Sequence, residues 1–337
     1  VIREFLPKQD LFSYLEAILR VYNLEGRRYN IHKARIKVLV KAVGPDKFRE
    51  MVEAEWHASR DFAPVHDEAA FARIAAFFAP PAYEALSDED VLSGKPTEFR
   101  NWYQRNTKRH KVSGYRAVFL SLKSPKRPPG DITESELDRV ADLADEYSFG
   151  LVRSTHDQNL IFADVRQRDL FAVWQALKAL DLATPNIGTL TDMICCPGLD
   201  FCSLANARSI PIAQQINDRF DSFDYLYDLG YIELKMSGCM NACGHHHVGH
   251  IGILGVDKGG EEWYQITLGG SASGPDAALG QVIGPSVAYD DVAETIERIL
   301  DVYVGEREEG ERFIDTVRRI GIKPFKARVY APSHQAA

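Results

Sequence analysis

Apolar residues in the first hundred positions recur with the period of a helix. Over 11–22 they fall on one face, and Gly26 follows them as a residue that ends a helix. The same pattern predicts a second helix over roughly 31–43 and a third after Pro45. Residues 60–97 hold two shorter helical patterns and then a polar loop. The first part of the chain is therefore predicted to be mainly helical.

The pattern changes after Phe99, where alternating apolar runs typical of strands join the helical ones. In order, it predicts a strand at 115–123, a helix at 132–148, paired strands at 150–155 and 159–165, and a helix at 168–180. Thr133 and Glu136 form the signature of a capping box at the start of the first of these helices. This order of elements is typical of a split βαβ, ferredoxin-like fold.

These changes in pattern indicate the α+β class and divide the chain into three predicted domains. A mainly helical segment covers 1–97, and a ferredoxin-like half-domain covers 98–185. A third domain over 186–337, of α/β type, contains glycine-rich strands and a helix at roughly 289–308.

Composition and charge narrow the classes of function. The 337 residues are 45% hydrophobic, enough for a large core, and carry a net charge of −8 without a long basic tract. We therefore expect no nucleic-acid partner. No apolar run approaches the roughly 20 residues that span a bilayer, and no signal peptide is visible, so we expect no membrane partner. The chain begins with Val1 rather than Met, which favours the back part of a longer protein.

All five cysteines lie between Cys195 and Cys243. A small, odd number is not a disulfide framework and favours a reducing compartment, the cytoplasm. Cys196 and Cys202 stand as C-x5-C, and Cys239 and Cys243 stand as C-x3-C. Two close pairs of thiolates suit one metal or cluster site, and soft thiolate ligands favour an iron–sulfur centre. The C-x5-C spacing is wide for structural zinc, which stays open as an alternative, as do free buried cysteines.

Glycine and histidine residues surround these cysteines. We expect Gly198, Gly238 and Gly244 to let the backbone approach an inorganic core and to offer their amides to sulfur. Residues 245–247 and His250 are histidines, which invite a zinc-ligand or haem-ligand interpretation. Three successive rings cannot share one face of a strand or helix. We therefore expect at most one of these histidines near a cofactor. The others are expected at the protein surface or behind the residues that contact the cofactor.

The cysteines stand in two longer motifs, TDMICCPGLDFCSLA and LKMSGCMNACGHHHVGHIGILG. Together these motifs resemble the paired cysteine motifs of the sirohaem-containing sulfite and nitrite reductases. The segments YNLEGRRYNIHKARIKVLVKAVGPDKF and GLVRSTHDQNLIFADV also resemble that family, as do ITLGG and GERFIDTVRRIGI nearer the C-terminus. The resemblance covers essentially the whole chain, which looks like the C-terminal portion of a sulfite reductase haemoprotein beta-component.

The resemblance implies roles for individual residues. Cys196, Cys202, Cys239 and Cys243 match the four ligands of a 4Fe–4S cluster, and Cys243 matches the thiolate that also bridges to the iron of sirohaem. Cys195 has no counterpart among the ligands and is expected to be a spare thiol. The other residues implied to bind the cofactors are Asn241 and Gly244 beside the cluster and macrocycle, and Arg28, Asn30, Lys33, Arg35 and Lys37 near the sirohaem carboxylates. The alternative for this basic stripe is a solvated helix face.

The chain also departs from the family pattern. The family's N-terminal half supplies most of the Arg and Lys residues that bind the substrate anion, and no such lysine motif occurs here. We therefore assign no catalytic residue and expect an incomplete, N-terminally truncated enzyme. Asp157 and Gln158 stand where the first half of the family has a basic pair, which indicates a vestigial second site.

The resemblance implies an oxidoreductase that reduces sulfite to sulfide, with electrons passing through the cluster to sirohaem. Reduction of nitrite to ammonia is an alternative that shares every motif, because substrate choice lies in the other half of the family's chain. A stand-alone iron–sulfur electron carrier and a zinc-stapled interaction module are alternatives from other classes of protein.

The electron donor is expected to be a protein, either a ferredoxin or a flavoprotein reductase subunit. No G-x-G-x-x-G motif stands at a strand-to-helix turn, so we expect no bound nicotinamide. A ferredoxin docks through its acidic face, which requires a local basic patch on this acidic chain. The candidates for that patch are Lys108, Arg109, Lys111, Lys123, Lys126 and Arg127, with solvated loop charges as the alternative.

Overall fold

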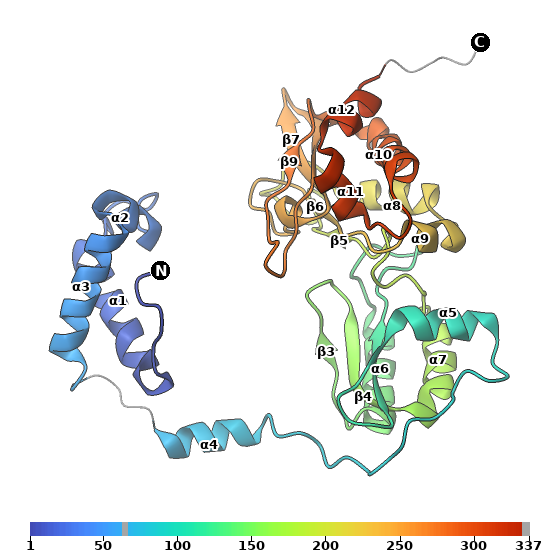
Figure 1. Ribbon diagram of the computed structural model, residues 1–337, viewed down its shortest axis with the longest axis horizontal. Coiled ribbons are helices and arrows are strands. Elements are labelled where there is room, and N and C mark those ends of the chain that lie inside the picture. The colour runs from blue at the N-terminus through green and yellow to red at the C-terminus, as the bar shows by residue number, and fades with distance from the viewer. Residues whose placement is uncertain (63–66, 332–337) are drawn as a thin grey trace. The chain divides into compact units, whose positions relative to one another are not determined.

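The computed structural model describes residues 1–62 and 67–331 and divides the chain into two compact units, Val1–Tyr83 and Glu84–Ala337 (Figure 1). The first unit has one hydrophobic core, and the second unit has two. The mixture of helices and sheets confirms the α+β class. The three domain ranges proposed from the sequence stay predictions.

The first unit is helical in its described part. Its elements are η1 (Lys8–Asp10), α1 (Leu11–Glu25), α2 (Ile36–Val43), α3 (Pro45–Ser59) and α4 (Glu68–Ala76). Its core is formed by Tyr14, Ala17 and Val21 of α1, Leu39 of α2, and Phe48, Val52 and Trp56 of α3. Gly26 ends α1 as predicted.

Two expectations for this unit are wrong in detail. The second helix begins at Ile36 rather than near residue 31, because successive backbone turns, such as Asn30 to Arg27 and Lys33 to Asn30, occupy the segment before it. The described part of 60–97 contains one complete helix, α4, where the sequence predicts two. Residues 79–90 form no helix, since Pro80 and Pro81 have no backbone N–H to donate.

The ferredoxin-like half-domain forms the first part of the second unit. Its elements are α5 (Thr97–Asn106), β1 (Thr107–Arg109), β2 (Tyr115–Leu120), α6 (Glu134–Tyr147), β3 (Arg153–Ser154), β4 (Leu160–Arg166), η2 (Gln167–Asp169) and α7 (Leu170–Ala179). The strands pair antiparallel in the order β1-β2-β4-β3. The predicted capping box is present at α6, where the Thr133 side chain accepts from the Glu136 amide and Glu136 bonds back to Thr133. The predicted strand–helix–strand–strand–helix order is confirmed from β2 to α7.

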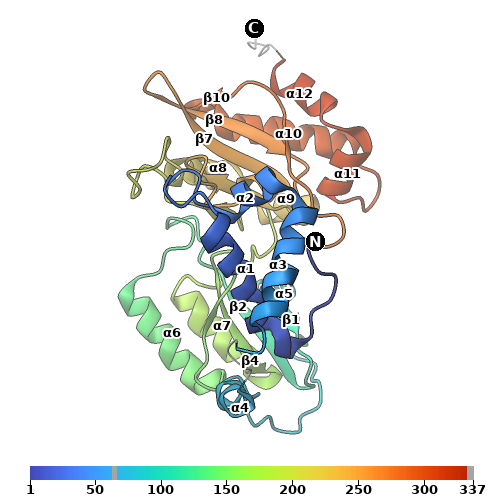
Figure 2. The same cartoon turned by 90° about the vertical axis from the view of Figure 1, so that its left-hand side faces the viewer.

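A larger sheet with five helices forms the rest of the second unit. Its elements are β5 (Ile194–Cys195), α8 (Ile210–Arg219), α9 (Phe223–Leu229), β6 (Leu234–Ser237), η3 (His246–Val248), β7 (Ile251–Lys258), β8 (Glu261–Leu268), β9 (Gln281–Val282), β10 (Val287–Ala288), η4 (Tyr289–Asp291), α10 (Val292–Glu306), α11 (Phe313–Ile320) and α12 (Lys323–Val329). The strand order is β10-β8-β7-β6-β5, and β9 pairs with β8. Figure 2 shows the long strands β7 and β8 with α10 and α12 beside them.

The direction of the strands in this sheet positions the cysteines. β5, β6 and β7 are parallel, whereas β8 returns antiparallel to β7. In a parallel sheet the carboxyl ends of the strands meet at one edge, and ligands bind in the loops that follow them. The loops after β5 and β6 contain all of the cysteines except Cys195, which is the last residue of β5. No helix among the described residues has the length and apolar character needed to cross a bilayer.

Candidate functional site

The two cysteine motifs lie side by side at the carboxyl ends of β5 and β6. Cys195 pairs with Met236 in the parallel register, and the Cys196 amide donates to the Met236 carbonyl oxygen at 3.1 Å. The loop after β5 then folds onto the loop after β6, since the amides of Asn206 and Ala207 donate to the Gly238 carbonyl oxygen. The fold therefore brings the C-x5-C and C-x3-C pairs, widely separated in sequence, to the same edge of one sheet.

The sulfur of Cys196 accepts hydrogen bonds from two backbone amides. The amides of Gly198 and Gly238 both donate to Cys196 Sγ at 3.4 Å. Hydrogen bonds to cysteine sulfur stabilise the thiolate form that ligates a cluster and help to set the cluster's reduction potential. The prediction that these two glycines offer their amides to sulfur is confirmed. For Gly244 it is wrong, because its amide donates to Ser237 Oγ at 3.1 Å.

The glycines also allow the two loops to pack tightly on the protein itself. Gly198 has a φ of 63°, and a Cβ there would stand 2.6 Å from the Ala207 carbonyl oxygen. A Cβ on Gly244 would stand only 1.9 Å from the Met236 carbonyl oxygen. Contacts this short exclude any side chain. In this structure, therefore, Gly198 and Gly244 are each packed closely against neighbouring backbone.

The C-x3-C loop holds two non-glycine residues in the left-handed region. Ala242 has a φ of 58° and His245 a φ of 54°. Such a conformation costs on the order of 1–3 kcal/mol per residue and is concentrated at functional sites. Turns maintain it, since the Ala242 amide donates to the Cys239 carbonyl oxygen and the His245 amide to that of Ala242. The loop thus directs Cys239 inward, where it is buried, and Cys243 outward, where it is exposed.

All five cysteines are free thiols, and they differ in exposure. Cys195, Cys196 and Cys239 are buried, Cys202 is partly exposed and Cys243 is exposed. Large apolar side chains on the same two loops are exposed as well, namely Leu199, Phe201, Leu204 and Met240. An exposed thiol among exposed apolar side chains is a surface that fits a flat macrocycle coordinated through sulfur. Asn241 is also exposed on this loop, whereas Gly244 is buried.

Among residues 1–62 and 67–331, no three His, Cys, Asp or Glu side chains gather closely enough to hold a single metal ion. Each thiolate of a 4Fe–4S cluster binds a different iron, so the ligands of a cluster stand farther apart than those of one ion. The paired loops, the amides on Cys196 Sγ and the free thiols are a donor set that fits such a cluster.

The histidines after Cys243 differ in exposure, and His247 is partly exposed. His246 and His250 are buried, and burial lowers the pKa of each to about 4, so both are neutral at pH 7. His250 Nδ1 accepts from the Glu233 amide, whereas His246 Nδ1 has no hydrogen-bond partner among the described residues. His245 is exposed. The expectation that at most one histidine lies near a cofactor stays a prediction.

The predicted sirohaem ligands of the first unit lie on the turns before α2 and on its first turn. Arg28, Lys33, Arg35 and Lys37 are exposed and Asn30 is partly exposed. Arg28 bonds to the Asn23 side chain, and Asn30 Oδ1 accepts from the His32 amide at 3.1 Å. Tyr29 and Ile31, between these cations, are more than four-fifths exposed. The segment therefore combines cations with apolar side chains, as a macrocycle bearing carboxylates requires.

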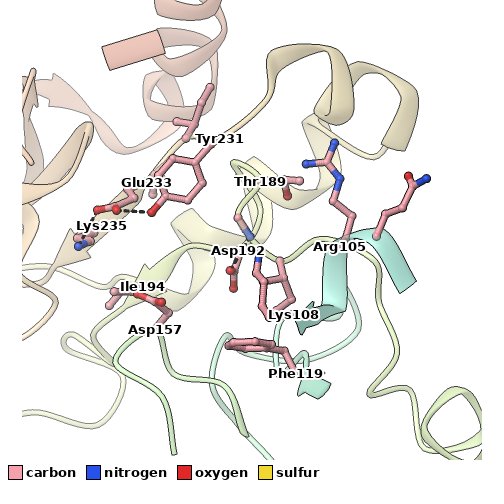
Figure 3. Close-up of a pocket in the computed structure, with 15 residues that line it drawn as sticks. Arg105, Lys108, Phe119, Asp157, Thr189, Asp192, Ile194, Tyr231, Glu233 and Lys235 are labelled. Atoms are coloured by element: carbon pink, nitrogen blue, oxygen red, sulfur yellow. Dashed lines mark hydrogen bonds and ion pairs between the residues drawn. The ribbon is translucent and has the colours of Figure 1, made fainter. Parts of the chain in front are cut away.

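A cavity of about 460 Å³ lies where β5 and β6 begin, at the opposite end of these strands from the cysteine loops. Figure 3 shows Arg105 and Lys108 on one side of it, Glu233 and Lys235 on the other, and Asp157 and Asp192 between. Burial and the charge of Asp192 raise the pKa of the Asp157 carboxyl. No signal in the sequence indicates Asp192 as part of this cavity, although it stands in the first cysteine motif.

Two members of the predicted docking patch are taken up by ion pairs within the chain: Lys123, which is buried and therefore wrong as a docking residue, and Arg127, which is partly exposed. The side chain of Lys123 has no exposed surface, and its Nζ donates to Asp192 Oδ1 at 3.2 Å. The Arg127 guanidinium forms a two-point pair with Glu136 and is largely covered. The remaining candidates, Lys108, Arg109, Lys111 and Lys126, are exposed.

The cysteine loops that follow the parallel strands β5 and β6 offer the thiolate ligands typical of an iron–sulfur protein, and comparison with known proteins gives the family. The model of the "Nitrite and sulphite reductase 4Fe-4S domain" matches residues 1–59 and 188–335, more than half of the chain. The model of the "Nitrite/Sulfite reductase ferredoxin-like half domain" matches residues 115–180. The chain belongs to the nitrite and sulphite reductase family.

Individual relatives cover both substrates. A protein named sulfite reductase (ferredoxin) 2, from Mycolicibacterium paratuberculosis, is 28% identical over 94% of this chain and 52% of its own length. The chloroplastic ferredoxin–nitrite reductase of Arabidopsis thaliana is 26% identical over 91% of this chain and 48% of its own. The solved structure of the Mycobacterium tuberculosis NirA protein matches with a TM-score of 0.66 and 27% identity, over 94% of this chain and 53% of that one.

This chain spans about half the length of those relatives. The family is one of oxidoreductases, and its cofactors are a 4Fe–4S cluster and sirohaem. The geometry of the cysteine loops described above fits the cluster.

Proposed function

We propose that this chain supplies the cluster-binding and sirohaem-binding part of an enzyme that reduces sulfite to sulfide. The observation that carries the proposal is the pair of cysteine loops at the carboxyl ends of β5 and β6. In these loops two backbone amides donate hydrogen bonds to Cys196 Sγ. The similarity to a sulfite reductase over 94% of the chain supports the choice of substrate. We place the enzyme in the cytoplasm, supported by five free thiols.

In this proposal Cys196, Cys202, Cys239 and Cys243 hold the cluster. Cys243, the exposed one, would also hold the sirohaem. Sirohaem supplies the iron at which the substrate is reduced, and the cluster supplies electrons to it. Asn241 and the Gly244 turn shape the loop around Cys243. The exposed Leu199, Phe201, Leu204 and Met240 provide apolar contact and exclude water.

The turns before α2 supply the counter-charges in this proposal. Sirohaem carries eight carboxylates, and exposed guanidinium and ammonium groups bind carboxylates with charge-assisted hydrogen bonds. The proposed ligands are Arg28, Asn30, Lys33, Arg35 and Lys37. Lys33, Arg35 and Lys37 take part in no ion pair among the described residues, so these cations are available for a ligand.

A second candidate function is reduction of nitrite to ammonia. It is favoured by the similarity to ferredoxin–nitrite reductases, one of them 29% identical over 84% of this chain. Steady-state assays of the full-length enzyme with reduced methyl viologen separate the two. We expect kcat/KM for sulfite to exceed that for nitrite. The reverse order would assign the enzyme to nitrite.

We propose a ferredoxin as the electron donor, since relatives of this chain carry ferredoxin in their names. The exposed cations of β1 and the following turn provide a basic patch for its acidic face. Of the four exposed candidates, Lys108, Arg109 and Lys111 form this patch, and Lys126 is left out because it lies on the separate loop between β2 and α6. A flavoprotein subunit is the alternative donor.

A further inference from the structure

The ferredoxin-like half contacts the C-x5-C loop through one side-chain amide. Gln158 Nε2 donates to the Cys195 carbonyl oxygen at 2.9 Å, and the Cys195 amide donates to Gln158 Oε1 at 2.8 Å. Cys195 is the last residue of β5 and directly precedes Cys196. The two bonds thus join residues 37 positions apart and link the turn between β3 and β4 to the last residue of β5, in the other sheet.

These bonds replace the neighbouring strand that β5 lacks. Among the described residues, β5 is the last strand of its sheet and pairs with β6 on one side only. In a parallel ladder, successive residues direct their backbone groups to opposite sides. Cys196 donates to Met236 of β6, so the N–H and C=O of Cys195 face the open side. The primary amide of Gln158 offers one donor and one acceptor, which match this exposed peptide edge.

The backbone around Gln158 is fixed in an uncommon conformation. Gln158 has a φ of 55°, in the left-handed region, which costs on the order of 1–3 kcal/mol for a non-glycine residue. Thr155 closes the turn, because its Oγ1 accepts from the amides of Asp157 and Asn159. The side chain lies against Gly130, where an added Cβ would stand 3.3 Å from Gln158 Cβ.

A buried ion pair anchors the same turn to the segment that enters β5. Lys123 Nζ donates to the Asp157 carbonyl oxygen at 2.5 Å and to Asp192 Oδ1 at 3.2 Å. Asn159 Nδ2 also donates to Asp192 Oδ1, at 2.9 Å. Figure 3 shows Asp157 and Asp192 close to Ile194, the first residue of β5. Hydrogen bonds therefore connect the turn that contains Gln158 to Asp192, which precedes β5, and to Cys195, which ends it.

We propose that Gln158 is a positioning residue for the cluster ligand Cys196. By holding both backbone groups of Cys195, it fixes the direction in which the chain leaves β5 and keeps Cys196 Sγ within reach of the Gly198 and Gly238 amides. It also couples the ferredoxin-like half to the cluster loop. The inference rests on the proposed function in one respect, that Cys196 ligates the cluster. Gln158 thus has a structural role in this chain. A residue that merely remained from a vestigial second site would need no such role.

The test compares Gln158→Leu with Gln158→Glu and with His156→Ala in the full-length enzyme. Leucine has a similar size and removes both bonds, whereas glutamate keeps the acceptor for the Cys195 amide and places an oxygen against the Cys195 carbonyl. His156 is exposed in the same turn and forms neither of these bonds, so it is the matched control. Each variant is measured for hydrogen exchange of the 194–198 segment and for the midpoint potential of its cluster by EPR-monitored titration.

We expect the Cys195 amide of Gln158→Leu to exchange roughly five- to tenfold faster, as loss of one hydrogen bond implies. The midpoint potential of its cluster should fall, because Cys196 Sγ loses amide donors. Gln158→Glu should show a smaller shift in the same direction, and His156→Ala none. If Gln158→Leu does not fold, Gln158→Glu carries the test alone. An unchanged potential in the folded Gln158 variants overturns the proposal.

Failure of the proposed function gives a different result. If the wild-type enzyme holds no cluster, then no potential is measurable in any variant and the function is wrong. Hydrogen exchange of the 194–198 segment in that protein still reports whether Gln158 holds Cys195. Equal exchange in wild type and Gln158→Leu would overturn the positioning role without reference to a cluster.

Discussion

Replacing Lys123 by methionine tests whether this lysine is a buried structural cation rather than a docking residue. Methionine retains the length of the side chain and removes its charge. The Lys123 side chain has no exposed surface and that of Asp192 is 7% exposed, so the change leaves a buried carboxylate without its counter-ion. Breaking a buried pair in this way costs about 3–5 kcal/mol.

The remaining contacts of Asp192 place the expected effect at the lower end of that range. Asp192 keeps hydrogen bonds from Asn159 Nδ2 and from the Gly188 amide, both at 2.9 Å. We therefore expect Lys123→Met to lower the free energy of unfolding of the second unit by about 3 kcal/mol. In the double variant Lys123→Met/Asp192→Asn, the loss should be smaller than the sum of the two single losses.

The assay is urea unfolding followed by fluorescence of Trp102 and Trp174, which lie in the core of the ferredoxin-like half. Lys126→Met is the matched control, because the Lys126 side chain is 82% exposed and should change stability by less than about 0.5 kcal/mol. A loss below about 1 kcal/mol for Lys123→Met, or simple additivity with Asp192→Asn, would refute the reasoning.

Three further predictions follow from the same structure. Gly244→Ala should destabilise the cysteine loops by about 1–3 kcal/mol, measured by thermal unfolding, because its Cβ would overlap the Met236 carbonyl oxygen; an unchanged Tm would show that the loop relaxes. Burial lowers the pKa of His250 from 6.5 to about 4, so the unfolded state binds protons first as pH falls. Stability should therefore decrease between pH 6.5 and 4, and His250→Gln should flatten that slope in urea titrations. The third prediction concerns the basic patch of Lys108, Arg109 and Lys111. Reversing these charges should slow turnover of the full-length enzyme with ferredoxin but not with methyl viologen. Equal effects on both rates would show that the patch is not the docking site.

Features with local causes could be predicted from the sequence. The capping box at Thr133 depends on residues within one turn, and the order of elements from β2 to α7 follows from hydrophobic period and turn residues. The two cysteine pairs were recognisable by spacing. Donation of the Gly198 and Gly238 amides to sulfur was expected, but that Cys196 Sγ accepts both was not.

Features that depend on distant partners could not be predicted. Lys123 ends the predicted strand at 115–123, next to a polar, proline-rich loop, and its partner Asp192 is 69 positions away. Gln158 bonds to Cys195, 37 positions away, through a turn whose left-handed φ no local pattern indicates. The late start of α2 has a different cause, because the sequence over 31–35 continues the helical pattern while the backbone forms turns. For Lys123 and Gln158, tertiary contacts decide the structure that local preference leaves open.

The central claim is that four of the five cysteines hold one cluster. It is tested most directly by iron and acid-labile sulfide content in five Cys→Ser variants of the full-length enzyme. Serine at Cys196, Cys202, Cys239 or Cys243 should abolish or strongly reduce the cluster, because each removes one thiolate ligand. Cys195→Ser should retain it, since Cys195 is buried beside Gln158 and its Sγ donates to the Cys196 carbonyl oxygen. Loss of the cluster in Cys195→Ser together with its retention in Cys196→Ser would contradict the account.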